Sequence, residues 1–405
     1  MKNYIRLTVS LAATLAMAGA FAQAQTGDAD QTTIDGNPVT PVAYVYVSTS
    51  NGINLYDAAS NGHLTEVSGS PFHTTLPMIG SNGSHFFTLD YTDFATIHSY
   101  SVASNGAIGS QVSSINSQNH TGVDCGSPDG AVLDHTGQNI YVLLDTSGNC
   151  GAYQTYGIGK TTGVLSFKGA AVNNNIQLND CCSVPAVTES NKFAYSQEQT
   201  FYCDGCYTTW GEFKIVNGVL ENSSSGVTGP TPKTSTQFLA PFLVATDNSD
   251  HVAVLGSWYD NNAGQYTGAG GFASYTVNSS TGALHSTNTW KQMPVPNVGA
   301  VSEIRMSPSG KILAVAGSNG LQLFHFNGAA PLTAFGGLLT KTEIDHVKWD
   351  TDNHLYALSD AYNMYASPNG KAELYEYTVT PTSVAAVSGA PVHIAGANGL
   401  VVVAK

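Results

Sequence analysis

FASYTV, residues 272–277, is one copy of a six-residue pattern that recurs along this chain of 405 residues. The first position is apolar, the fourth is aromatic, and the sixth is usually apolar. The copies, in chain order, are INLYDA (53–58), IHSYSV (97–102), YQTYGI (153–158), WGEFKI (210–215), FASYTV (272–277), LQLFHF (321–326) and LYEYTV (374–379). Because apolar residues at even spacing are typical of strands with one buried face, the pattern predicts seven related β-units.

The sequence around each copy completes a four-stranded unit. An apolar strand precedes each copy, as VAVL (252–255) precedes FASYTV. Five copies are followed by a turn and a Gly-x-apolar step, as in TGAL (281–284), which opens another strand. Six units also begin with a short apolar segment ending in a polar turn, as in RMSPSGK (305–311). Repeats of this length with four strands each are typical of propeller blades.

The two ends of the chain predict how the ring closes. The first unit lacks its leading strand, whereas ANGLVVVA (397–404) is a strand with no continuation. We therefore predict an all-β fold, a seven-bladed β-propeller with four-stranded blades, in which the C-terminal strand completes the first blade. A single domain would cover residues 41–405. A two-sheet sandwich is the alternative, but seven matched repeats and the unpaired strands at both ends favour the propeller.

The N-terminus and the composition indicate the compartment. Lys2 and Arg6 precede an apolar run that is too short to span a bilayer and ends in small residues near Ala22 or Ala24. This pattern predicts a signal peptide over 1–24, followed by a polar leader over 25–40. We expect a periplasmic or secreted protein without membrane insertion. Removal of the peptide leaves 12 basic and 28 acidic residues, a formal charge of −16, which disfavours nucleic acid as a partner.

Three segments carry a resemblance to a known family. They are LTEVSGSPF (64–72), MSPSGKILAVAG (306–317) and VAAVSGAPV (384–392). With these segments the chain resembles the lactonase-type seven-bladed propellers, the 6-phosphogluconolactonase-like proteins, over all seven repeats. The resemblance implies the fold and, by analogy, an enzyme that opens a lactone. Its motifs are structural, so they identify the scaffold better than the activity.

All six cysteines fall on one rim of blades 3 and 4. In an oxidising compartment an even number of cysteines favours disulfides. We expect Cys125 to pair with Cys150, and one of Cys181 and Cys182 to pair with Cys203 or Cys206. A zinc site is the alternative, since four thiolates suit structural zinc. A redox site is less favoured because the C-x-x-C motif lies between strands.

The resemblance implies polar residues where the inner strands enter the central pore. The corresponding positions here are mostly non-ionisable, namely Leu76, Gly130, Val184 and Phe242. Glu303 and His346 remain, with Glu343 and Asp345 nearby. A carboxylate and an imidazole could activate water for attack on a lactone carbonyl, and Arg305 could stabilise the oxyanion. The alternative is a structural ion pair between Glu303 and Arg305, with His346 packed between blades.

Aromatic and amide residues gather in long loops on the rim that holds the cysteines. Such side chains suit carbohydrate rings. The predicted ligand-binding residues are Trp258, Tyr259, Asp260, Tyr266, Tyr362, Asn363 and Tyr365. Rim aspartates admit a structural calcium ion, although solvated charge is the simpler interpretation; these are Asp90, Asp93, Asp145, Asp204 and Asp360. No other cofactor or metal is expected.

Three functions follow from these observations. We favour a propeller that binds a neutral, carbohydrate-like ligand. The mostly non-ionisable pore positions favour binding over catalysis, and the single arginine left after cleavage, with the acidic charge of the chain, favours a neutral ligand. A hydrolase that opens a neutral sugar lactone is the alternative, so the sequence leaves enzymatic activity open. An envelope scaffold that docks another protein is the third. We expect a monomer in each case.

Overall fold

The computed structural model describes residues 40–72, 77–90, 96–117, 120, 127–145, 151–173, 176–177, 184–200, 207–268, 270–351, 353–359 and 372–405. The predicted signal peptide and nearly all of the predicted leader lie outside these residues. Residues 40–405 form one compact unit.

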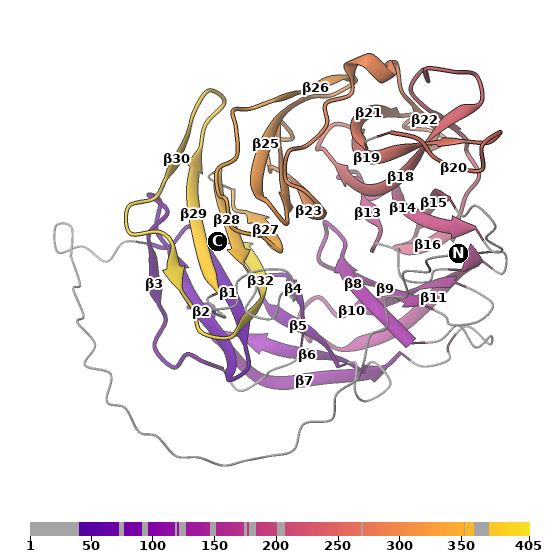
Figure 1. Cartoon of the computed structure of the whole chain (residues 1–405). Coiled ribbons are helices and arrows are strands. Elements are labelled where there is room, and N and C mark those ends of the chain that lie inside the picture. Colours follow the sequence, from indigo (N-terminus) through magenta and orange to yellow (C-terminus); the bar gives the residue numbers. More distant parts are fainter. Residues whose placement is uncertain are drawn as a thin grey trace, which may run out of the picture. The chain divides into compact units, whose positions relative to one another are not determined.

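Seven sheets, antiparallel apart from one short parallel pair in blade 5, follow one another around a ring, one for each repeat (Figure 1). From the innermost strand outward, blade 1 has β32 (Ala397–Ala404), β1 (Ala43–Thr49), β2 (Gly52–Ala58) and β3 (Leu64–Glu66). Blade 2 has β4 (Met78–Ser81), β5 (His85–Asp90), β6 (Thr96–Val102) and β7 (Ile108–Asn116). Blade 3 has β8 (Ser127–Leu133), β9 (Asn139–Asp145), β10 (Gly151–Ile158) and β11 (Leu165–Asn173). The predicted fold class is confirmed.

The remaining blades carry small additions to the four-stranded plan. Blade 4 has β13 (Ala186–Val187), β14 (Phe193–Thr200), β15 (Thr208–Val216), β16 (Val219–Asn222) and the extra β12 (Ile176–Gln177). Blade 5 has β18 (Gln237–Thr246), β19 (His251–Asp260), β21 (Gly271–Val277) and β22 (Leu284–His285), with β17 (Val227–Thr228) and β20 (Gln265–Tyr266) added. A 3₁₀-helix, η1 (Trp290–Gln292), follows blade 5. Blade 6 has β23 (Val301–Met306), β24 (Ile312–Gly317), β25 (Gly320–Asn327) and β26 (Ala330–Ala334). Blade 7 has β27 (His346–Trp349), β28 (His354–Ser359), β29 (Glu373–Val379), β30 (Val384–Ala386) and the extra β31 (Val392–His393).

The ring closes through the C-terminal strand, as the sequence predicts. β32 pairs with β1 in antiparallel register from Ala43 opposite Ala404 to Thr49 opposite Ala397. The first blade therefore takes its inner strand from one end of the chain and its other three strands from the other end. Among the described residues, no helix is long and apolar enough to cross a membrane.

The core is divided among the junctions between neighbouring blades. Each of seven buried clusters joins two blades, as Phe87 of blade 2 meets Ile140 of blade 3. The aromatic residue at the fourth hexad position contributes to these clusters, and Tyr156, Tyr275 and Phe324 are fully buried. The recurring aromatic is therefore the side chain that fills the space between blades, where its large apolar surface stabilises the ring.

The glycine of the Gly-x-apolar step lies against the preceding blade. In blade 5, Gly282 has a φ of +83°, and a Cβ placed there would lie 2.5 Å from the ring of Phe193. Only glycine fits both this backbone conformation and this close approach. The same contact recurs at five other junctions, where the pairs are Gly106 with Tyr44, Gly163 with His85, Gly218 with Asn139, Gly328 with His251 and Gly62 with His354.

Two glutamates are buried within the sheets, and their raised pKa values predict how the stability of the fold depends on pH. Burial and the charge of Glu212 raise the pKa of Glu198 to about 8. Burial raises the pKa of Glu376 to about 7, although His354 opposes the shift. Both folded values exceed the unfolded value of about 4.3, so the folded chain holds these protons more tightly. Their contribution to stability is present at low pH and is lost as pH rises through about 7 to 8.

We expect the double variant E198Q/E376Q, which keeps the shape of both side chains, to flatten this dependence. Thermal unfolding of the wild type and the variant across about pH 5 to 9 measures it. Other titrating groups are common to both proteins, so the difference reports the two glutamates. Parallel profiles for the two proteins would show that these carboxyls do not bind protons more tightly in the folded chain.

Candidate functional site

A charged cluster lies where the inner strands of blades 6 and 7 meet. Strand alternation places Glu303 and Arg305 on one face of β23, and the structure joins them, with Nε of Arg305 donating to Oε1 of Glu303 at 2.7 Å. The Lys348 ammonium of β27 donates to the same oxygen at 2.6 Å. The other oxygen accepts the backbone N–H of Val347 at 2.6 Å. The carboxylate therefore ties the two blades together.

These contacts decide the protonation state of Glu303. Burial alone would raise the pKa of Glu303, but Arg305, Lys348 and His346 outweigh it and hold that pKa well below the usual range. Burial and the charge of Arg305 lower the pKa of Lys348 to about 8, against the opposing effect of Glu303. A carboxylate that holds its charge so firmly is a weak acceptor for a proton from water. The cluster resembles the ion pair that we considered as the alternative to catalysis.

The roles of Glu303, His346 and Arg305 in catalysis stay predictions. His346 lies two residues before Lys348 on β27 and is near enough to Glu303 for its charge to lower the pKa of that carboxyl. Asp345 and His346 both make interactions within the fold.

Three of the four predicted non-ionisable positions, Gly130, Val184 and Phe242, lie within the described residues. A Cβ on Gly130 would lie 2.8 Å from Cγ1 of Val184. The ring of Phe242 lies 5.6 Å from that of Tyr266, centroid to centroid. Leu76 lies outside the described residues. Glycine and apolar residues therefore hold these positions in blades 3 to 5, whereas blades 6 and 7 bring charged side chains to their junction.

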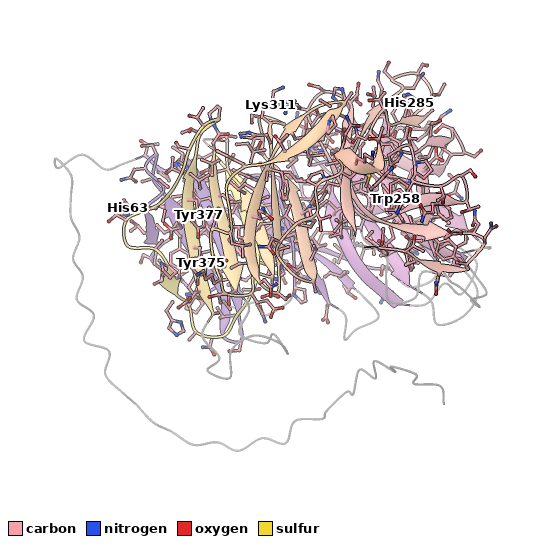
Figure 2. The ribbon with its side chains drawn as sticks, turned by 45° about the horizontal axis from the view of Figure 1, so that its top comes forward. His63, Trp258, His285, Lys311, Tyr375 and Tyr377 are labelled. Carbon is pink, nitrogen blue, oxygen red and sulfur yellow. The ribbon has the colours of Figure 1, made fainter. Side chains whose placement is uncertain are left out.

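A pocket of about 450 Å³ lies on blade 5, on the rim that carries the long loops. We call it the blade-5 pocket. Trp258, at the end of β19, and Trp290, of η1, contribute its aromatic walls, and Figure 2 shows Trp258 on its sheet. Gln237 and Thr267 line it and are joined to each other, with Nε2 of Gln237 donating to Oγ1 of Thr267 at 2.9 Å. Lys233 also lines the pocket, and its Nζ lies 5.7 Å from the centroid of the Trp290 ring.

The other described rim residues lie beside this pocket rather than in its lining. Tyr259 points to the opposite face of β19 from Trp258, is 4% exposed, and its ring lies 4.7 Å from that of Tyr207. The Tyr266 hydroxyl accepts a hydrogen bond from the Thr208 backbone. Asp260 organises its turn by accepting the backbone N–H of Asn262 at 2.9 Å. The structure thus brings Trp258 into the pocket and places its three neighbours in the supporting structure.

The other predicted site residues lie outside the described residues. Tyr362, Asn363 and Tyr365 are among them, as are all six cysteines, Cys125, Cys150, Cys181, Cys182, Cys203 and Cys206. The disulfides and the second half of the predicted rim site therefore stay predictions. Within the described part of the chain, no group of three or more His, Cys, Asp or Glu residues could hold a metal ion.

Fold and site together define a seven-bladed β-propeller with a charged blade 6–7 junction and an aromatic pocket on blade 5. The sequence matches no protein-family model and no curated protein. Solved structures do resemble it. One is titled a "putative 6-phosphogluconolactonase" from Bacteroides uniformis, with a TM-score of 0.60 and 12% identity, over 89% of this chain and 99% of that one.

Two further structures show the same likeness. A protein from Bacteroides fragilis with the same description has a TM-score of 0.55 at 13% identity, over 91% of this chain and 99% of that one. The periplasmic gluconolactonase of Pseudomonas aeruginosa has a TM-score of 0.54 at 13% identity, over 89% and 99%. In fold, this chain is similar to these propellers. Identity this low establishes the fold and carries no activity with it.

Five residues of these sites were missed by sequence reasoning, namely Lys348, Trp290, Lys233, Gln237 and Thr267. Lys348 stands two positions after His346, so alternation alone could have placed it on the same face of β27. Trp290 is one of four tryptophans, but nothing in the sequence of its loop indicates that it lies beside Trp258. A T-x-x-Q signal, Thr289 to Gln292, does contain it, and Oε1 of Gln292 accepts the Thr289 backbone N–H at 3.0 Å. Lys233 belongs to a loop without any pattern.

Proposed function

We propose that the protein binds a neutral, carbohydrate-like ligand in the blade-5 pocket. The observation that carries the proposal is the combination of Trp258 and Trp290 with the polar side chains of Gln237, Thr267 and Lys233 in one concave site. Sugars present apolar C–H faces and hydroxyl edges, which aromatic faces and amide or hydroxyl groups complement. The volume, about 450 Å³, falls in the ordinary range for small-molecule sites.

The pocket is preformed, because contacts with the surrounding sheet fix the positions of its lining residues. Trp258 packs against the buried cluster of blades 4 and 5. The backbone N–H of Thr267 donates to the Trp258 carbonyl at 2.7 Å, which fixes the loop over the strand. A preformed site spares a ligand the entropic cost of ordering it. We expect the protein in the periplasm or outside the cell, where glycans are present as ligands for such a site.

Lactone hydrolysis is the second candidate, favoured by the Arg305 and Lys348 cations and the His346 imidazole at the blade 6–7 junction. Such groups could stabilise an oxyanion. This candidate lacks a strong general base, because the Glu303 carboxylate already contacts four donor nitrogens, two of Arg305, one of Lys348 and the backbone nitrogen of Val347. A docking scaffold has less support, because the exposed large apolar side chains of the described residues are spread over blades 2 to 5.

The test is a glycan screen followed by titration of the selected glycan, read by tryptophan fluorescence and calorimetry. We expect W258A to weaken binding about tenfold or more, the effect of losing one aromatic platform of roughly 1.5 kcal/mol. F335A is the control. Phe335 is a half-buried aromatic of blade 6 whose ring lies 4.2 Å from that of His325, centroid to centroid, and it does not line the pocket.

F335A should bind as the wild type does. Equal affinity of W258A and the wild type would remove the ligand from this pocket. Absence of any glycan binding, combined with hydrolysis of a neutral sugar lactone, would transfer the assignment to the hydrolase.

A further inference from the structure

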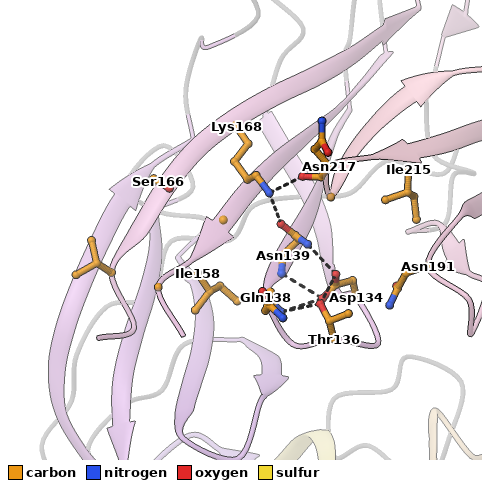
Figure 3. Close-up of a pocket in the computed structure, with 14 residues that line it drawn as sticks. Asp134, Thr136, Gln138, Asn139, Ile158, Ser166, Lys168, Asn191, Ile215 and Asn217 are labelled. Carbon is orange, nitrogen blue, oxygen red and sulfur yellow. Dashed lines mark hydrogen bonds between the residues drawn. The ribbon is translucent and has the colours of Figure 1, made fainter. Parts of the chain in front are cut away.

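A second pocket opens between blades 3 and 4 on the other rim, where the short turns lie (Figure 3). We call it the blade 3–4 groove. Its volume is about 700 Å³. Its lining comes from the β8–β9 turn and the outer hairpin of blade 3, together with turns of blade 4. None of its residues lines the blade-5 pocket.

The sequence explains why the groove opens at this junction. At six junctions the glycine of the Gly-x-apolar step contacts a side chain at the start of the second strand of the preceding blade. That side chain is a ring at five of them, as Phe193 is beneath Gly282. At the blade 3–4 junction it is Asn139, beneath Gly218, and asparagine is much smaller than a ring. The missing ring leaves space between the blades, and the space is polar.

The floor of the groove is rigid because Asp134 is fully engaged. One carboxylate oxygen accepts the backbone N–H groups of Gln138 and Asn139 at 2.9 and 3.1 Å. The other accepts the Asn139 side-chain amide and the Thr136 hydroxyl, both at 2.7 Å. Asp134 and Asn139 are 5% and 6% exposed. The acceptor capacity of this carboxylate is used within the turn, so its oxygens are hydrogen-bonded to the turn and not directed at a ligand.

Lys168 reaches across the groove from the outer strand of blade 3, as Figure 3 shows. Its ammonium donates to Oδ1 of Asn139 at 2.9 Å and to the backbone carbonyl of Asn217 at 2.8 Å. An ammonium has three N–H donors, so one is left for a ligand. Among the described residues, no carboxylate forms an ion pair with Lys168. Both of its partners are neutral oxygens, and its positive charge is not cancelled.

Neutral polar groups surround this ammonium. Ser166, Gln138 and Asn191 line the same groove. The side-chain oxygen of Asn191 accepts the His135 backbone N–H at 3.3 Å, which leaves its amide NH₂ as a donor. Figure 3 shows Asn191 and Lys168 at different edges of the same space. The site thus offers one fixed cation and several amide and hydroxyl groups, with no aromatic wall.

We infer that the blade 3–4 groove binds a small polyhydroxylated ligand that carries one anionic oxygen group, a carboxylate or a phosphate ester. The anionic group contacts the Lys168 ammonium through a charge-assisted hydrogen bond. The hydroxyl groups exchange hydrogen bonds with the amides and Ser166. This ligand differs in charge from that of the blade-5 pocket, so the protein has two sites of different chemistry on opposite rims.

Ligand-observed saturation-transfer NMR tests the inference with three probes on the full chain: D-glucuronate, methyl β-D-glucoside and inorganic phosphate. We expect saturable glucuronate binding and displacement of glucuronate by phosphate. Glucoside is compared in W258A, in which the blade-5 pocket is weakened, and there its binding should be at least about tenfold weaker than that of glucuronate. K168M should weaken glucuronate binding about tenfold or more, the scale for one charged hydrogen bond. K160M is the control, because Lys160 is an exposed lysine in the outer hairpin of the same blade and its loss changes the net charge equally.

A second variant guards against loss of the fold. S166F changes an exposed residue of the lining to a ring that fills the groove, and it should abolish glucuronate binding while leaving the melting temperature unchanged. W258A should bind glucuronate as the wild type does, which separates this site from the blade-5 pocket. Equal losses in K168M and K160M, equal affinity of W258A for glucoside and glucuronate, or no binding of glucuronate by the wild type would each overturn the inference.

Discussion

A chain that lacks residues 397–405 is expected to lose the stable propeller. β32 supplies the inner strand of blade 1, and its Leu400 and Val401 are 4% and 7% exposed. Their burial alone contributes roughly 3 to 6 kcal/mol, using about 1.5 to 3 kcal/mol per side chain. The deletion also leaves β1 as an unpaired inner edge. Since whole proteins are stable by only about 5 to 15 kcal/mol, this loss is a large fraction of the total.

Circular dichroism melting and limited proteolysis measure the effect. Removal of Lys405 alone is the control, because this residue is exposed and lies just beyond the strand. The control should melt close to the full-length protein, whereas the longer deletion should show a much lower midpoint and rapid cleavage. If the two truncations melted alike, closure of the ring through β32 would not contribute to stability as the structure indicates.

Replacement of Glu303 by Gln is the second substitution with a large expected effect. An amide cannot satisfy the same four donors, and it leaves Arg305 and Lys348 facing each other without the charge between them. Breaking a buried ion pair costs about 3 to 5 kcal/mol. Because Arg305 is 42% exposed and water screens part of its charge, we expect roughly 2 to 3 kcal/mol for E303Q.

The pH dependence of this effect has a definite sign. The folded pKa of Glu303 lies below its unfolded value of about 4.3. Its stabilising contribution is therefore present above about pH 4.3 and falls as pH drops toward the folded value. Denaturant unfolding at pH 7 and at about pH 4 should show a smaller difference between E303Q and the wild type in acid. E343Q, which changes a neighbouring glutamate outside the cluster, should have little effect at either pH, and an equal loss in E343Q would contradict this account.

Much of the fold was predictable because its signals are local. Each hexad falls on the third strand of its blade, as FASYTV falls within β21. The predicted closing strand, 397–404, coincides with β32. Alternation also correctly placed Glu303 and Arg305 on one face of β23. These features depend on the period of a single strand and on turn residues, which a sequence displays directly.

The sites were less predictable because they depend on which segments meet in space. The contact of Lys348 with Glu303 requires the relative register of β23 and β27, which belong to different sheets. The blade-5 pocket requires the loop after β22 to return over β19, so Trp290 was not expected beside Trp258. The blade 3–4 groove opens because Asn139 stands where the other five junctions have a ring. It becomes visible only after the second strands have been aligned in three dimensions.

The most direct test of the proposed function compares W258A with E303Q on one ligand. The glycan selected by the screen is titrated calorimetrically into the wild type, W258A and E303Q at a temperature where all three are folded. If the ligand binds in the blade-5 pocket, the affinity of W258A for it should be about tenfold or more weaker than that of the wild type, and the affinity of E303Q should be unchanged. The reverse result, with E303Q weakened and W258A unchanged, would place the ligand at the blade 6–7 junction and contradict the proposal.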